Sequence, residues 1–177
     1  TYIKKDISDL TEEDKILYIE KLKEKLNKMT SLSSQPVNQT RWVSIDKVQA
    51  NDYNPNTVAK VEMGLLYTSI KHDGYTQPIV TIYDKELDKY IIVDGFHRYF
   101  VCKSNKDILE RNQGKLPIVV IDKDINDRMA STVRHNRARG KHSVNGMSHM
   151  VFSMLDNGWK DEDICNHLGM EADELLR

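Results

Sequence analysis

A strand that leads directly into a helix, over residues 90–104, is the sequence feature that most constrains the fold. The apolar run Tyr90–Val93 predicts a buried strand, and helical spacing begins after Asp94 and Gly95. A helix that starts at such a turn leaves its first N–H groups unpaired, and its dipole attracts anions. Arg98, one turn into the helix, can add a forked contact to phosphate oxygens. The segment predicts a phosphate site; the alternative is a simple turn in which Asp94 caps the helix.

Length, charge and cysteine content limit the class of protein. A chain of 177 residues can bury a core and fits one domain with an appendage. The formal net charge is -1, so a nucleic-acid contact must come from a local basic cluster. Cys102 and Cys165 lie far apart, which is typical of reduced thiols, and no apolar run approaches the roughly 20 residues that cross a bilayer. We therefore expect a cytoplasmic protein without a membrane partner.

The order of the expected elements divides the chain into three parts. Residues 1–38 hold an amphipathic helix, from Leu10 to Met29, and an irregular linker. Residues 39–124 mix strands with helices, and residues 125–177 show helical patterns only. Strands are expected at 42–45, 77–83, 90–93 and 116–121, and core helices at 58–73 and 96–104. We therefore predict an α+β fold, with a small mixed-sheet core followed by an all-helical segment.

The apolar spacing in the last third of the chain predicts four helices. They are expected to end near Gly140, at Asn157, at Leu168 and beyond Arg177. The third and fourth are separated by a glycine turn, which gives the spacing of a helix-turn-helix. The start of the fourth helix, at 171–174, is rich in carboxylates, which opposes direct docking of that helix on DNA phosphates.

A basic field lies on and just after the first of these helices. No acidic residue occurs between Arg128 and Leu155. The residues that we expect to contact a DNA backbone are Arg134, Arg137, Arg139 and Lys141. The alternative is a solvated helix face whose ion-pair partners lie elsewhere.

Further candidate residues lie near the strand-to-helix turn. Asp94 and His97 can hold a divalent ion or move a proton and are the catalytic candidates, although Asp94 can instead be a helix cap. The segment Thr76–Pro78 places a hydroxyl and an amide where they can read a base or ribose; the alternative is a strand that starts with proline. The histidines and cysteines lack the spacing of zinc ligands, so we expect no zinc site.

Four motifs, in this order, resemble the ParB/sulfiredoxin superfamily, and specifically its ParB-like branch. They are the Asn54-Pro55 turn, the segment from Ser69 through Gly74 and Gln77-Pro78 to Val80, the Gly95-Phe96-His97-Arg98 box, and the box from His135 to Arg139. The resemblance covers residues 42–177. It implies a nucleotide-binding core followed by a helix-turn-helix.

Within this branch the chain is most similar to the immunoglobulin-binding regulator B group, through Asp94–Arg98 and Arg134–His142. That group comprises prophage-associated co-activators of transcription. The resemblance implies a regulator that binds DNA and a nucleotide (CTP, ATP or ADP), with Mg²⁺ as a candidate ion. It also implies a partner protein resembling phosphoadenosine-phosphosulfate reductase, and a homodimer is a candidate assembly.

The resemblance also assigns the nucleotide site. The phosphates are expected on the loop from Gly95 to Arg98, with Thr76 and Gln77 near the sugar or base. The full set of nucleotide-binding candidates is Thr76, Gln77, Pro78, Gly95, Phe96, His97, Arg98, Asn136 and Arg139. Asn136 and Arg139 are expected to close over the triphosphate, and Asn136 is the candidate Mg²⁺ ligand.

Two departures from the superfamily bear on activity. Sulfiredoxins need a cysteine where this chain has Phe96, so sulfinic-acid reduction is not expected. CTP-hydrolysing ParB proteins use a glutamate where this chain has His135, which argues against metal binding and CTP turnover. Free serine kinases, in contrast, carry an Asp-Gly-His-His-Arg-like box close to Asp94–Arg98. A nucleotide-dependent phosphotransferase, a nuclease or another NTPase on this fold therefore remains an alternative, as does a protein-interaction module with a vestigial pocket.

Overall fold

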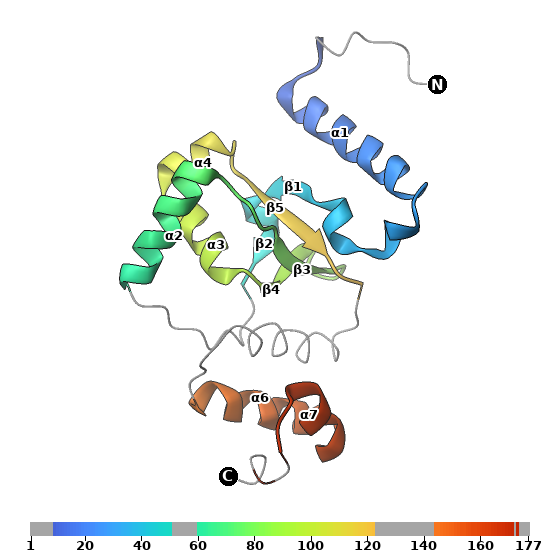
Figure 1. Cartoon of the computed structure of the whole chain (residues 1–177), viewed down its shortest axis with the longest axis vertical. Coiled ribbons are helices and arrows are strands. Elements are labelled where there is room, and N and C mark those ends of the chain that lie inside the picture. The colour runs from blue at the N-terminus through green and yellow to red at the C-terminus, as the bar shows by residue number, and fades with distance from the viewer. Residues whose placement is uncertain (1–8, 51–59, 123–143, 172, 174–177) are drawn as a thin grey trace.

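The computed structural model describes residues 9–50, 60–122, 144–171 and 173. Figure 1 shows a small sheet with helices packed against it, an N-terminal helix, and two further helices toward the C-terminus. Within these parts of the chain, every helix is too short or too polar to cross a membrane.

The core is a mixed sheet of five strands. These are β1 (Arg41–Ser44), β2 (Val48–Gln49), β3 (Ile79–Asp84), β4 (Lys89–Asp94) and β5 (Lys115–Val120), in the order β1-β5-β3-β4-β2. β3 and β4 form an antiparallel hairpin, whereas β3 runs parallel to β5 and β2 runs parallel to β4. The parallel pairs require crossover connections, which the helices supply. The predicted α+β class is therefore confirmed.

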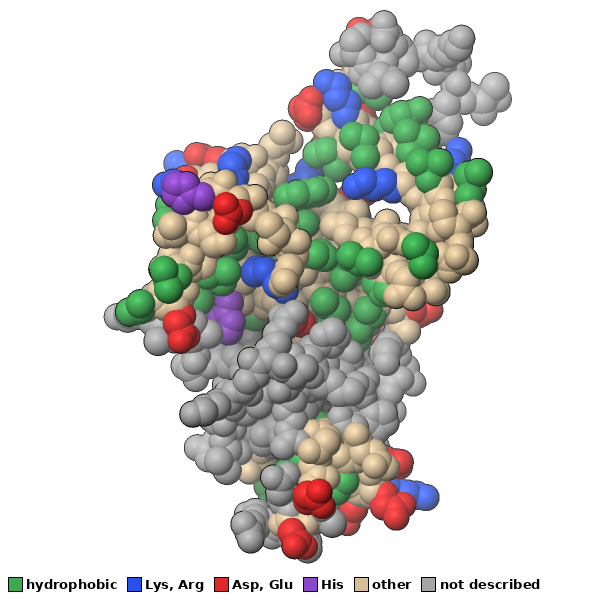
Figure 2. Space-filling model, viewed as in Figure 1, with side chains coloured by type: hydrophobic (Ala, Val, Ile, Leu, Met, Phe, Trp, Pro, Cys, Tyr) green, Lys and Arg blue, Asp and Glu red, His purple; other side chains and the backbone are tan. Residues whose placement is uncertain are grey.

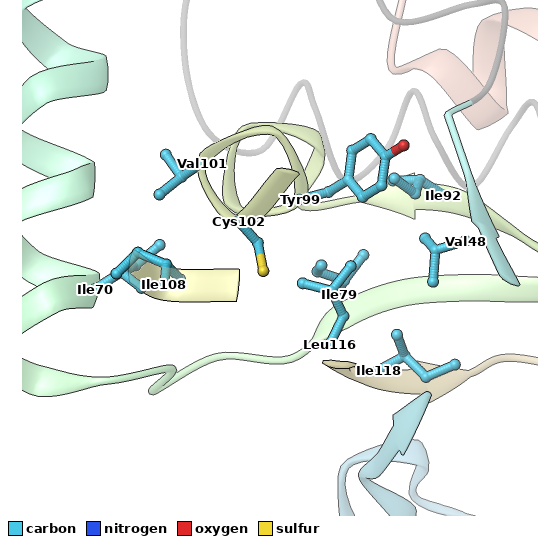
Figure 3. Close-up of a cluster of buried hydrophobic side chains, with 10 residues drawn as sticks. All are labelled: Val48, Ile70, Ile79, Ile92, Tyr99, Val101, Cys102, Ile108, Leu116 and Ile118. Carbon is cyan, nitrogen blue, oxygen red and sulfur yellow. The ribbon is translucent and has the colours of Figure 1, made fainter. Parts of the chain in front are cut away.

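Three helices complete this core: α2 (Lys60–Asp73), α3 (Phe96–Ser104) and α4 (Lys106–Arg111). Figure 3 shows the buried cluster in which the side chains of these helices meet those of the sheet. Ile79, Leu116 and Ile118 from the strands and Cys102 from α3 are fully buried there. Burial of such aliphatic side chains is the main stabilising contribution, at roughly 1.5–3 kcal/mol each. α3 is thereby fixed against the sheet, so the turn between β4 and α3 has a defined position.

The N-terminal helix is α1 (Glu12–Asn27), which begins where Thr11 Oγ1 accepts a hydrogen bond from the Asp14 N–H. The expectation of an irregular linker after this helix is wrong, because the 3-10 helices η2 (Ser31–Ser34) and η3 (Pro36–Gln39) fill most of that stretch. Hydrogen bonds from side-chain amides, rather than a periodic apolar pattern, stabilise this stretch. Asn27 Nδ2 donates to the Ser33 carbonyl (3.2 Å), and Asn38 Nδ2 donates to the Leu32 carbonyl (2.9 Å).

Most apolar positions of the helix expected from Leu10 to Met29 are exposed. Ile19, Leu22, Leu26 and Met29 keep 50%, 41%, 61% and 80% of their surface in solvent. Figure 2 shows apolar side chains gathered on the surface in the region where Figure 1 places α1 and the short helices after it. A polar contact joins this helix to the core: the Trp42 N–H donates to Glu20 Oε1 at 2.7 Å.

The C-terminal segment contains α6 (Val144–Asp156) and α7 (Asp161–Leu168), as expected. Gly158 and Gly169 adopt left-handed backbone angles after these helices, which is the usual role of glycine at a helix C-terminus. Among the side chains of these two helices that the structure describes, the buried apolar ones are Val151, Met154, Ile164 and Leu168. The expected helix near residues 129–140, the Asn54–Asn56 turn and most of the fourth helix lie outside the described residues.

Candidate functional site

The site is built on the turn between β4 and α3. β4 ends at Asp94, and Gly95 is the N-cap of α3, with φ 96° and ψ 21°. This left-handed conformation is readily available to glycine and costly for other residues. The N-cap is therefore Gly95 rather than Asp94, which corrects the alternative in which Asp94 caps the helix. Because Gly95 has no side chain, the first turn of α3 receives no side-chain cap from it.

Arg98 bends back over this turn. A Cβ added to Gly95 would lie only 2.7 Å from Arg98 Nη2, so the guanidinium occupies the space that glycine leaves open. Arg98 Nη1 donates to Gln77 Oε1 at 2.5 Å, and Nη2 donates to the Pro78 carbonyl at 3.4 Å. Nη2 also pairs with Asp94 Oδ2 at 3.3 Å. The structure thus brings together residues of the loop before β3, the end of β4 and the start of α3.

The ion pair between Arg98 and Asp94 is buried, so it contributes to the fold as well as to the candidate site. The side chains of Arg98 and Asp94 are 14% and 7% exposed. Charges so far from water are tolerated only when they are paired and hydrogen-bonded, as they are here. An arginine held in a fixed orientation beside a helix N-terminus can bind an anion without a further ordering cost for its side chain.

Tyr75 is part of the site, although it was not among the residues predicted from the sequence. Its hydroxyl donates to the Arg98 carbonyl at 2.7 Å, and its ring meets the edge of the Trp42 ring. Burial raises the pKa of Tyr75, so the phenol remains a neutral donor. Its position just before Thr76–Pro78 was the only available signal in the sequence.

The remaining residues of the loop are aromatic or imidazole side chains that are partly buried. Phe96 packs against the rings of His97, Tyr99 and Phe100, with the Phe100 ring stacked at a centroid distance of 6.1 Å. The Phe96 side chain thus packs among aromatic neighbours and offers no nucleophile. Burial raises the pKa of the Cys102 thiol in the core, which fits the expected role of that cysteine in packing.

Thr76 and Gln77 are exposed, which leaves their polar groups accessible to a ligand. Asn136, Arg134, Arg137, Arg139 and Lys141 lie outside the described residues, so the expected closure over a triphosphate and the basic field are not described. In the described ranges, no group of three or more His, Cys, Asp or Glu side chains could hold a metal ion. The carboxylate at the turn pairs with Arg98, so the described residues fit an anion and do not form a ligand set for Mg²⁺.

Comparison with known proteins gives two family matches. Residues 28–134 match the ParB N-terminal domain, and residues 142–177 match the IbrB-like C-terminal HTH domain. A relative from Escherichia coli (strain K12), "Uncharacterized protein YbdM", is 40% identical over 172 residues, which cover 97% of this chain and 81% of the relative.

Solved structures of the chromosome-partitioning protein ParB from Caulobacter crescentus are also similar. The complex with CTP-gamma-S has a TM-score of 0.47 at 20% identity and covers 77% of this chain and 74% of that chain. The complex with the centromeric parS site has a TM-score of 0.49 at 19% identity and covers 77% and 68%. The ParB N-terminal domain match spans more than half of the chain. The chain therefore belongs to the ParB-like family, with a ParB N-terminal domain followed by an IbrB-like C-terminal helix-turn-helix domain.

Proposed function

We propose that this protein is a nucleotide-responsive, DNA-associated regulator of transcription whose nucleotide phosphates bind at the turn from Gly95 to Arg98. The observation that carries the proposal is the position of the Arg98 guanidinium over the Gly95 backbone, at the N-terminus of α3. Helix N–H groups, the helix dipole and a forked cation converge there, and each favours a phosphate. Thr76 and Gln77, on the loop before β3, extend the site toward a sugar or base.

DNA binding is assigned to the C-terminal part of the chain. The family match identifies the helix-turn-helix domain, and α6 and α7 belong to it. α7 begins with Asp161, Glu162 and Asp163, which stabilise a helix N-terminus but repel DNA phosphates. We therefore assign the backbone contacts to the basic field of Arg134, Arg137, Arg139 and Lys141.

A nucleotide regulates such a protein only if it binds two arrangements of the chain with different affinities. Asn136 and Arg139 are the proposed second half of the site, and they lie within the basic field. If that segment closes over a triphosphate, the position of its basic side chains changes, and so does their access to DNA phosphates. From the family resemblance we further propose that the protein acts in the cytoplasm as a co-activator and forms a homodimer. The resemblance also suggests a partner protein similar to phosphoadenosine-phosphosulfate reductase.

Isothermal titration with CTP, ATP, ADP and GTP tests the nucleotide site. We expect heat from at least one nucleotide, and a loss of affinity of tenfold or more in Arg98→Ala, because bonds to a charged group contribute about 1.5–3 kcal/mol each. Lys103→Ala removes the same charge from the last turn of α3 and serves as the matched control. The proposal fails if no nucleotide gives heat and Arg98→Ala leaves DNA affinity unchanged.

DNA binding is tested by its dependence on salt. Phosphate contacts predict a linear fall of log affinity with log salt, with a slope that becomes shallower by about one when one basic contact is removed. Arg137→Ala should show this change. Turnover of a labelled nucleotide that Asp94→Asn abolishes would instead assign an enzyme to the same turn.

A further inference from the structure

We propose that Gln77 is an internal placeholder: its amide oxygen occupies, at Arg98 Nη1, the position that a phosphate oxygen takes when the ligand binds. This inference rests on the proposed function. It assigns Gln77 a role opposite to that of a direct reader of base or ribose, and the two roles predict effects of opposite sign.

The acceptors around Arg98 differ in how easily they can leave. Asp94 is buried and ends a strand of the sheet, and its bond to Nη2 joins two charges. The Pro78 acceptor is a backbone carbonyl directly before β3, so it is fixed by the sheet. Gln77 is exposed and contacts Nη1 through the end of a flexible side chain. Gln77 is therefore the acceptor that a ligand can displace without disturbing the fold.

Displacement is favourable on physical grounds. The bond from the guanidinium to the Gln77 amide has a charged donor only, whereas a phosphate oxygen is a charged acceptor as well and adds the attraction of an ion pair. The released Gln77 amide returns to water, and its side chain regains rotamer freedom that costs up to about 2 kcal/mol to fix. Asp94 and the Pro78 carbonyl keep Nη2 oriented during the exchange. The arginine therefore does not have to be ordered again when the anion arrives.

The placeholder also explains the low exposure of Arg98. The side chain retains only 14% of its surface in solvent although it lies beside an exposed loop, and Gln77 contacts its outer nitrogen. Without a ligand, the Gln77 amide oxygen accepts the hydrogen bond of Arg98 Nη1, which would otherwise lack a partner in a partly buried position. A ligand must break this bond first, so the bond lowers the apparent affinity for phosphate.

Titration of the full chain with inorganic pyrophosphate and with CTP tests the inference. Pyrophosphate has no base or sugar, so it isolates the phosphate contacts. For Gln77→Ala we expect about three- to tenfold tighter binding of pyrophosphate, because one hydrogen bond fewer must be broken. Gln77→Met, which keeps the shape but has only a weak acceptor, should show the same direction. Gln35→Ala, which removes an exposed glutamine beside η3, is the matched control and should bind as the wild type does.

The outcomes separate this inference from the proposed function. If the wild type binds pyrophosphate and both Gln77 variants bind it equally or more weakly, the placeholder is wrong and the nucleotide site stands. If neither the wild type nor the variants bind pyrophosphate or CTP, both proposals fall. The strongest support would be pyrophosphate binding by the Gln77 variants when the wild type shows none. If Gln77→Ala fails to fold, Gln77→Met shows whether the affinity for pyrophosphate rises or falls.

Discussion

Arg98 is held at its guanidinium by Asp94, Gln77 and the Pro78 carbonyl, while its own carbonyl accepts the Tyr75 hydroxyl. Asp94 lies four residues before Arg98, and the other partners lie 20 to 23 residues before it in the chain. A single side chain thus joins the hairpin strands to α3. Substitutions beside it should therefore alter both stability and ligand binding.

Gly95→Ala should destabilise the fold and weaken phosphate binding. The substitution forces a φ of 96° on alanine, and its Cβ would lie 2.7 Å from Arg98 Nη2. Arg98 can move aside, but it then gives up its acceptors. We expect the free energy of unfolding in urea to fall by about 1–3 kcal/mol. Gly64→Ala is the control, since a Cβ there meets nothing within 4 Å inside α2 and should stabilise by about 0.5–1 kcal/mol. An unchanged midpoint for Gly95→Ala would contradict the proposed strain.

Tyr75 gives the protein a predictable sensitivity to alkali. Burial raises the pKa of Tyr75 in the folded state above its ordinary value of about 10. The unfolded chain therefore loses this proton at a lower pH than the folded chain. The stabilisation is complete below about pH 10 and is lost as pH rises, by at most about 1.4 kcal/mol per pH unit before solvent screening is discounted.

Tyr75→Phe should remove this part of the slope when unfolding free energies are measured from pH 9 to 11. At neutral pH it should cost about 1 kcal/mol, because the bond to the Arg98 carbonyl is lost. Tyr18→Phe, on the exposed surface of α1, should retain the slope of the wild type. Equal slopes for wild type and Tyr75→Phe would contradict the assignment.

Elements that depend on local patterns were predicted well from the sequence. α3 has the bounds that were expected, since the Asp-Gly turn and the helical spacing are both local signals. The strands β3 and β4 were also expected, with ends that differ by one or two residues. β2 and α4 were missed, because two strand residues and six helix residues are too short for a periodic pattern. β2 exists because β4 offers it a parallel partner, which sequence does not reveal.

The same distinction applies to the site. Gly95, Arg98 and Gln77 were named together from the family resemblance, and the structure brings them into contact. The pairing of Asp94 with Arg98 was not predicted, because it depends on the conformation of the turn at Gly95. The bond from Tyr75 was not predicted either, because it joins the loop before β3 to α3 through tertiary packing. Arg111 is a further example: it donates to the carbonyls of Ile70 and Lys71, at 2.9 Å each, and so caps α2 from 40 residues away.

On the scale of the whole molecule, two polar contacts join α1 to the core. The Trp42 N–H donates to Glu20 Oε1, and Glu20 lines a groove between α1 and residues 39–41. A second contact joins Lys115 to Glu13 at 3.6 Å, but Glu13 is exposed, and such pairs contribute at most about 1 kcal/mol. The Trp42 ring contacts Tyr75, which in turn bonds to Arg98. Contacts therefore run from α1 through β1 to the candidate site.

Glu20→Ala should release α1 while leaving the core folded. The substitution removes the acceptor of a partly buried backbone N–H, and no large apolar contact compensates, because most apolar side chains of α1 are exposed. We expect trypsin to cleave at lysines of α1 several-fold faster, as followed by mass spectrometry, while the fragment that begins near β1 persists. Glu24→Ala is the control: it removes an exposed carboxylate one turn further along, whose ion pair is with Lys28 in the next turn. If both variants are cleaved at the wild-type rate, the Glu20 contact does not hold α1. A change in Trp42 fluorescence and in pyrophosphate affinity specific to Glu20→Ala would show that the attachment of α1 is transmitted to Arg98.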